Sequence, residues 1–110
     1  MLSVATLGLL PLTAYPGVAS APTVAHTGAA RPVTIQNFSF RPATAMVKPG
    51  TTVTWTNRDS VAHTVTSDTG VFGSGVLSRG GTYSYVFRRA GTYHYHCRIH
   101  PRMKGTVTVR

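Results

Sequence analysis

Acidic residues are nearly missing from this chain of 110 residues, which has 2 Asp and Glu against 11 Lys and Arg and a formal net charge of +9. Such an imbalance is typical of proteins that meet an acidic partner, an anionic surface or a nucleic acid, and it says nothing about the fold. Every Lys and Arg lies at or after Arg31. The length is enough for one small domain.

Cysteine and histidine are also scarce. Cys97 is the only cysteine, so an intrachain disulfide is excluded, and the thiol needs another role, either metal ligation or pairing with another molecule. The chain has five histidines, too few for the several histidine clusters of redox enzymes with multinuclear metal sites. Redox catalysis is therefore disfavoured, and we expect a protein that is not an enzyme.

No apolar run is long enough to cross a bilayer comfortably. Residues 1–12 are apolar and resemble the hydrophobic part of a secretory signal, and Ala19-Ser20-Ala21 fits the small-residue cleavage rule. We expect residues 1–21 to be a signal peptide, 22–30 a flexible linker and 31–110 the folded domain. No basic residue precedes the apolar run, which leaves two alternatives: an uncleaved N-terminal anchor, or a true start further upstream. Export predicts a periplasmic or extracellular protein.

The domain has the pattern of short β-strands. Apolar and polar residues alternate in segments such as 52–56, where Val53 and Trp55 share one face, and Pro and Gly separate the segments. Residues 68–81 hold five of the eleven glycines and are expected to be mainly loop. No segment has a convincing amphipathic helical pattern. We therefore predict an all-β fold, a sandwich or barrel.

Alternation also orients the cysteine. Tyr93, Tyr95 and Cys97 fall on one face of a strand, and His94 and His96 fall on the other. Because large tyrosines belong in a core, Cys97 is expected to point inward at the end of the sandwich. His94 and His96 are expected to point outward and not to bind the metal held by Cys97.

The C-terminal run Cys97-Arg98-Ile99-His100-Pro101-Arg102-Met103 carries the chemistry. A thiolate, an imidazole and a thioether are ligands that copper prefers, and one more histidine would complete a trigonal site with a weak axial methionine. His63 can supply that nitrogen. Taken singly, each of these residues is more often a core or surface residue, but together they predict a metal site made of His63, Cys97, His100 and Met103.

Three blocks of sequence support this interpretation and carry a family resemblance. They are the segment from Val47 to Asn57, the His63-Thr64-Val65 triplet, and the segment from Gly91 to Met103. On these blocks the chain resembles the cupredoxins, small plastocyanin-like blue copper proteins, and the amicyanin branch in particular. The resemblance covers about residues 33–110 and implies a cupredoxin-like Greek-key β-sandwich or barrel that holds one copper ion.

The resemblance implies an exported type 1 copper protein that carries one electron at a time between redox partners, cycling between Cu(I) and Cu(II). It also implies that His100 exposes its ring edge as the point of electron exchange. Thr64 stands where these families commonly have an asparagine that tethers the ligand loop. Its hydroxyl can replace only part of that hydrogen bonding, which leaves the rigidity of the loop an open question. Asn57 could compensate or could simply close the preceding loop.

Alternatives remain open at this point. The nearest is a periplasmic or extracellular copper chaperone or buffer on the same fold. Nucleic-acid binding, suggested by charge and strand aromatics, is disfavoured by the export signal and the complete ligand set. Arg98, Arg102 and Lys104 lie in or beside the ligand run. We therefore expect a monomer that meets redox partners through their acidic surfaces and touches a membrane only if its N-terminus is an anchor.

Overall fold

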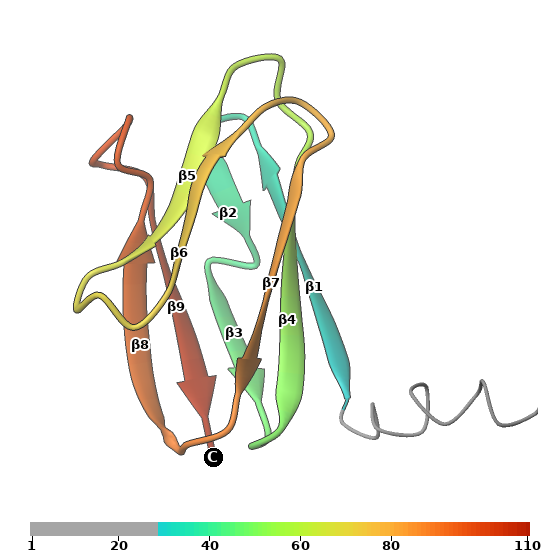
Figure 1. Ribbon diagram of the computed structural model, residues 1–110, viewed down its shortest axis with the longest axis vertical. Helices are drawn as coiled ribbons and strands as arrows, with labels where there is room; N and C mark the ends of the chain where they lie inside the picture. Colours follow the sequence, from blue (N-terminus) through green and yellow to red (C-terminus); the bar gives the residue numbers. More distant parts are fainter. Residues whose placement is uncertain (1–28) are drawn as a thin grey trace, which may run out of the picture.

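The computed structural model describes residues 29–110, which form two β-sheets packed face to face (Figure 1). This part of the chain contains no helix, and so none that could cross a membrane. The all-β fold expected from the sequence is confirmed. The strands of the described residues are β1 (Ala30–Gln36), β2 (Ser39–Arg41), β3 (Thr44–Val47), β4 (Thr51–Asn57), β5 (His63–Ser67), β6 (Gly73–Leu77), β7 (Thr82–Phe87), β8 (Gly91–His96) and β9 (Lys104–Val109).

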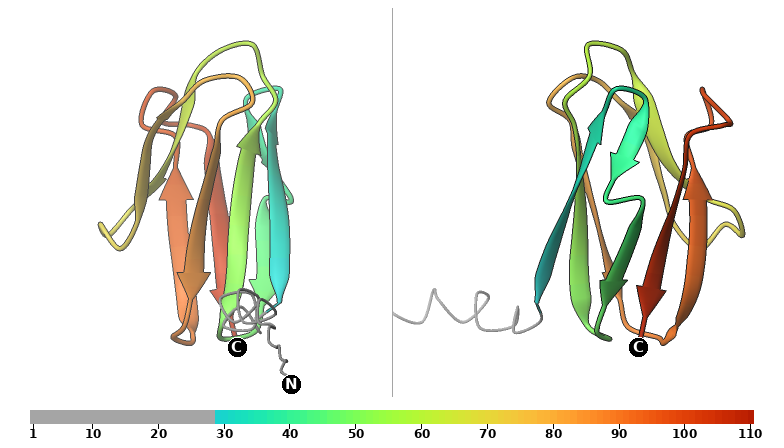
Figure 2. Two further views of the ribbon diagram at one scale, coloured as in Figure 1. Left: turned by 45° about the vertical axis from the view of Figure 1, so that its right-hand side comes forward. Right: turned by 180° about the vertical axis from the view of Figure 1, so that it is seen from behind.

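The two sheets form distinct layers (Figure 2). Within the described residues, one sheet has the strand order β2-β1-β4-β7 and the other the order β3-β9-β8-β5-β6. Most neighbouring strands are antiparallel, but β1 runs parallel to β4 and β3 runs parallel to β9. Parallel neighbours need crossover connections, so the chain passes repeatedly between the layers.

Trp55 lies at the centre of the core, and its side chain is fully buried. Its ring packs against Phe72 at 5.8 Å, Tyr83 at 5.7 Å and Tyr95 at 5.4 Å between centroids. These aromatic side chains come from both sheets and from the loop before β6. Strand β4 follows the predicted alternation, because every second residue from Thr51 to Asn57 is buried. This packing fixes the position of one sheet relative to the other.

Two segments add to or differ from the sequence-based expectation. Phe38, which the apolar pattern groups with Phe40, lies in the turn between β1 and β2 and is 53% exposed. Residues 68–81 are mainly loop, as expected, but they also contain the short strand β6, which pairs with β5 and which the sequence did not predict. Glycines at 73 and 75 hide this strand from propensity arguments, since glycine has no preference for extended backbone.

The predicted boundaries can be compared with the structure only from residue 29 onward. The expected signal peptide, 1–21, lies outside the described residues, as does all but the end of the expected linker, 22–30. The first strand begins at Ala30, next to the expected domain start. The turn after β1 and the loops before β5 and after β8 lie at one end of the sandwich, opposite the start of β1 and the C-terminus (Figure 1).

Candidate metal centre

The predicted ligands come from that loop-bearing end. His63 is the first residue of β5, Cys97 follows the last residue of β8, and Met103 precedes β9. His100 lies in the short loop between Cys97 and Met103. The loop closes on itself, because the Cys97 amide donates to the Met103 carbonyl and the Met103 amide donates to the His100 carbonyl, both at 2.9 Å.

Three donor atoms converge. Cys97 Sγ lies 3.7 Å from His63 Nδ1 and 3.6 Å from His100 Nδ1, and the three atoms lie within 4.8 Å of one another. A metal held at about 2.3 Å from sulfur and about 2.0 Å from nitrogen separates those donors by roughly 3.5 Å at a tetrahedral angle and roughly 3.7 Å at a trigonal one. The observed spacings therefore fit one shared metal ion.

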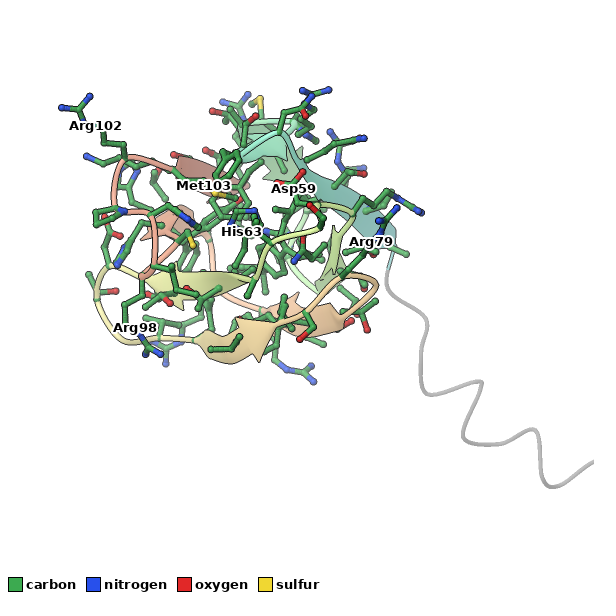
Figure 3. All side chains as sticks on the ribbon, turned by 90° about the horizontal axis from the view of Figure 1, so that it is seen from above. Asp59, His63, Arg79, Arg98, Arg102 and Met103 are labelled. Carbon is green, nitrogen blue, oxygen red and sulfur yellow. The ribbon has the colours of Figure 1, made fainter. Side chains whose placement is uncertain are left out.

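Burial differs sharply among these residues. Cys97 and His63 are fully buried and Met103 is 4% exposed, whereas His100 is only partly buried. Seen from this end, Met103 lies beside His63, while Arg98 and Arg102 point outward (Figure 3). His100 also lines a shallow surface hollow with Ile99, Pro101 and Arg102. His100 is thus the donor residue that reaches the surface.

Asp59 holds the buried His63 in place. Its Oδ2 lies 2.7 Å from His63 Nε2, so the Nε2–H donates to the carboxylate and the Nδ1 lone pair faces Cys97. A carboxylate behind a metal-binding histidine orients the ring and fixes its tautomer. The sequence analysis missed Asp59. Its position four residues before His63, as one of only two acidic residues in the chain, was the available signal.

Asp59 also secures an unusual turn. Its two oxygens accept from the backbone amides of Asn37 at 2.7 Å and Phe38 at 2.9 Å. Both residues have left-handed backbone, with φ of 53° and 57°, a conformation that a phenylalanine rarely adopts. The carboxylate thereby helps to hold a conformation that the chain would otherwise resist.

Several groups set the pKa of Asp59. Partial burial alone would raise the pKa of this carboxyl. The hydrogen bonds from the Phe38 and Asn37 amides and the contact with His63 outweigh that effect, so the pKa lies below its ordinary value of 3.8. Asp59 is therefore ionised at neutral pH and can accept from all three donors.

The turn places Phe38 over the site. Its ring meets the His63 ring edge-on at 5.3 Å and the His100 ring edge-on at 5.0 Å. Phe38 thus covers both candidate imidazoles while leaving about half of its own surface exposed. The sequence pattern could not reveal this, because the contact depends on the backbone conformation of the turn.

Thr64 provides the tether that was in doubt. The Thr64 amide faces Cys97 Sγ at 3.3 Å, and its hydroxyl oxygen accepts from the Arg98 amide at 2.7 Å. The hydroxyl also bonds to the Thr66 hydroxyl at 2.8 Å. One buried threonine therefore links β5 to the beginning of the ligand loop, although with one hydroxyl in place of an amide group.

Asn57 closes the preceding loop and makes no hydrogen bond to the ligand loop. Its side-chain amide donates to the carbonyls of Val61 and Leu77, and its oxygen accepts from the Asp59 amide at 2.9 Å. The residue is fully buried. Asn57 acts on the site indirectly, because it positions the loop that carries Asp59.

His94 and His96 lie away from these donors, as alternation predicts. Both are on β8, on the face opposite Tyr95 and Cys97, and neither belongs to the converging group. His94 is exposed and His96 is partly exposed. Strand geometry alone was sufficient to separate them from Cys97.

Comparison with known proteins agrees with this arrangement. A family model described as a cupredoxin-like domain matches residues 8–109. Amicyanin from Paracoccus denitrificans is 40% identical over 82 residues, which cover 70% of this chain and 63% of that protein. The match thus spans less than two thirds of that relative.

Solved structures show the same similarity. The purple cupredoxin from Nitrosopumilus maritimus is 35% identical with a TM-score of 0.68, over 73% of this chain and 99% of that one. An amicyanin variant solved in its reduced Cu(I) form is 37% identical with a TM-score of 0.70, over 74% of this chain and 82% of that one. Together with the family model and the arrangement of the donors, these similarities show that the chain belongs to the cupredoxin-like family.

Proposed function

We propose that this protein is an exported type 1 copper protein that carries single electrons between redox partners. His63, Cys97 and His100 would be the three strong ligands of one copper ion, and the Met103 thioether would be a fourth, weak ligand. The observation that carries the proposal is the convergence of Cys97 Sγ on two histidine Nδ1 atoms at 3.6 and 3.7 Å. When bound, copper supplies the one-electron couple between Cu(I) and Cu(II).

The chain itself would keep the site from rearranging. Asp59 holds a proton on His63 Nε2, and Thr64 holds the ligand loop against β5. Phe38 limits the approach of water to both imidazoles. Rigid ligands suit electron transfer, because a geometry between the preferences of the two oxidation states needs little change when the electron moves. His100, the donor residue at the surface, would be the point of exchange.

The same proposal includes the processing and location of the chain. Residues 1–21 would act as a signal peptide and residues 22–30 as a linker, which places the domain of residues 31–110 in the periplasm or outside the cell. The protein would act as a monomer and would perform no catalysis of its own. The signal proposal is supported by the apolar segment and by the Ala19-Ser20-Ala21 motif.

Visible and EPR spectra of the Cu(II)-loaded protein test the function. We expect intense blue absorption and the narrow copper splitting of a thiolate site, and Cys97→Ala should remove both. The matched control is His96→Gln, the neighbouring residue, whose side chain lies outside the converging group. A colourless wild-type protein with ordinary tetragonal copper signals would contradict the proposal and favour the copper chaperone or buffer.

A partner with an acidic surface would fit the exchange end. Arg98, Arg102 and Lys104 are exposed and lie within four residues of His100 along the chain. Two exposed apolar side chains adjoin His100: Phe38 packs edge-on against its ring, and Ile99 lines the same surface hollow as His100 and Arg102. Apolar contact at the centre with charge at the rim is a common arrangement for specific, transient docking. The positive rim would speed the encounter, and the apolar centre would bring the His100 edge close to the partner.

Small oxidants of opposite charge test the rim without a known partner. Oxidation of the reduced protein by the anion hexacyanoferrate(III) should slow as ionic strength rises from about 0.01 M to about 0.15 M, because the screening length falls from about 30 Å to about 8 Å. A cationic cobalt(III) oxidant should show the reverse trend. Arg102→Gln should flatten the anion's salt dependence, whereas Arg110→Gln at the opposite end should not. If the oxidation rates of both variants depended equally on ionic strength, the result would contradict a role for the rim.

A further inference from the structure

The outer face of β8 carries a second group of metal-binding side chains. His94 and His96 are two residues apart on this strand, so their side chains share the face opposite Cys97. At about 3.3 Å per residue, their Cα atoms are roughly 7 Å apart. The His94 ring bonds toward Thr106 on β9 and the His96 ring toward Asp68 after β5, so one ion would be bound between them once the rings turn toward each other. Asp68 directly follows β5 and lies next to this strand, because its backbone amide donates to the His94 carbonyl at 2.9 Å.

The hydrogen bonds of these histidines leave one nitrogen free on each ring. His96 Nδ1 lies 2.6 Å from Asp68 Oδ1, so the Nδ1–H donates to the carboxylate and Nε2 keeps its lone pair. His94 Nδ1 bonds to the Thr106 hydroxyl at 3.1 Å. Within residues 29–110 neither Nε2 has a hydrogen-bond partner. A histidine backed by a carboxylate on one nitrogen is the usual state of a metal ligand.

The distribution of acidic residues adds to this argument. The chain has two of them: Asp59 backs the candidate copper ligand His63, and Asp68 backs His96 in the same manner. Asp68 is 48% exposed in a chain with a formal charge of +9, yet its side chain contacts a histidine and none of the 11 Lys and Arg. A surface contact between charged groups adds little to stability, so stability alone does not explain why the partner of Asp68 is a histidine.

We propose that His94 and His96, with Asp68 orienting His96, form a second, solvent-facing site for a divalent transition-metal ion, Zn²⁺ or Cu²⁺. Two neutral imidazoles suit these cations, and water would fill the remaining positions. Lys104 lies opposite His96 across β8 and β9, and its positive charge opposes the bound cation. The site is independent of the copper site inside the sandwich and does not rest on its proposed function.

Zn²⁺ titration of the protein loaded with Cu(I), which is diamagnetic, tests the proposal. NMR signals of the His94 and His96 rings should shift together, and calorimetry should show one equivalent of Zn²⁺. His94→Gln should abolish this binding, and Asp68→Asn should weaken it about tenfold or more, the usual effect of removing a carboxylate behind a ligand. Lys104→Gln should strengthen it. Because the ring signals report on the outer face alone, the result does not depend on the colour of the inner site.

His26, the remaining histidine, lies outside the described residues and supplies the control. His26→Gln should leave the stoichiometry and affinity unchanged. Zn²⁺ binding that survives His94→Gln, or that disappears in His26→Gln, would overturn the proposal. Failure of millimolar Zn²⁺ to shift the His94 and His96 signals would overturn it as well.

Discussion

Asp59→Asn should weaken copper binding by about 10- to 100-fold, the usual cost of removing a carboxylate behind a metal-binding histidine. Three donors face this side chain: the amides of Asn37 and Phe38 and His63 Nε2–H. An asparagine keeps one acceptor oxygen and turns an NH₂ group toward at least one of these donors. The tautomer of His63 and the position of Phe38 should both loosen. Copper affinity can be measured by competition with a chelator, with the blue absorption as the signal.

Asp68→Asn is the matched control, because it makes the same chemical change at the chain's other aspartate–histidine pair. Its partner His96 is not among the donors near Cys97, so the blue absorption should respond to the chelator as in the wild type. Equal loss of affinity in both variants would mean that total charge, and not the bond to His63, controls binding at the thiolate site.

Asp59 should also make stability depend on pH. Its pKa in the folded chain is below the ordinary value of 3.8, so its charge stabilises the fold above the pKa of the unfolded carboxyl. That contribution is lost as the pH falls through the lower, folded value. The difference in melting temperature between wild type and Asp59→Asn should therefore be largest near neutral pH and should shrink below about pH 4.

Gly105→Ala should destabilise the fold by about 1–3 kcal/mol, the usual cost of forcing extra volume into a packed core. Gly105 lies directly opposite Tyr95 across β8 and β9, and the tyrosine ring covers it. A Cβ added at this position would overlap the ring, with Cε1 at 2.8 Å. Tyr95 cannot easily move, because it packs against Trp55 and Phe40. For a domain of this size the melting temperature should fall by roughly 4–8 °C per kcal/mol.

Gly73→Ala provides the comparison. Gly73 also lies in a strand, has no left-handed backbone, and has open space where a Cβ would be placed. This variant should be neutral, or more stable by up to about 1 kcal/mol, because alanine restricts the unfolded chain. Both proteins should be compared by thermal unfolding at the same metal content. A Gly105→Ala protein as stable as Gly73→Ala would show that the Tyr95 ring can shift aside.

The inward direction of Cys97 and the outward direction of His94 and His96 could be predicted from alternation alone. Side chains on a strand alternate strictly, and Tyr93 and Tyr95 identify the inner face. The four predicted ligands followed from the preference of copper for thiolate, imidazole and thioether groups at short spacing. The structure places the three strongest of these donors at distances that suit one ion.

Asp59, Phe38 and Thr64 act through contacts that no periodic pattern encodes. The Asp59 carboxylate reaches a turn 21 and 22 residues away because two strands bring that turn to the same end of the sandwich. Phenylalanine is a residue type that is common in strands, but the left-handed backbone of Phe38 places it in a turn. The role of Thr64 depends on the separation of β5 from the ligand loop, which only the folded chain defines.

The described chain starts and ends at the same end of the sandwich, opposite the turn after β1 and the loops before β5 and after β8 (Figure 1). A tag, a fused domain or a surface linkage joined directly at Ala29 or at Arg110 would therefore be held away from His100. On an electrode coated through such a linkage, the exchange edge would face the solution and the sandwich would separate it from the conductor. Wiring the protein efficiently would require an attachment residue engineered beside the ligand loop.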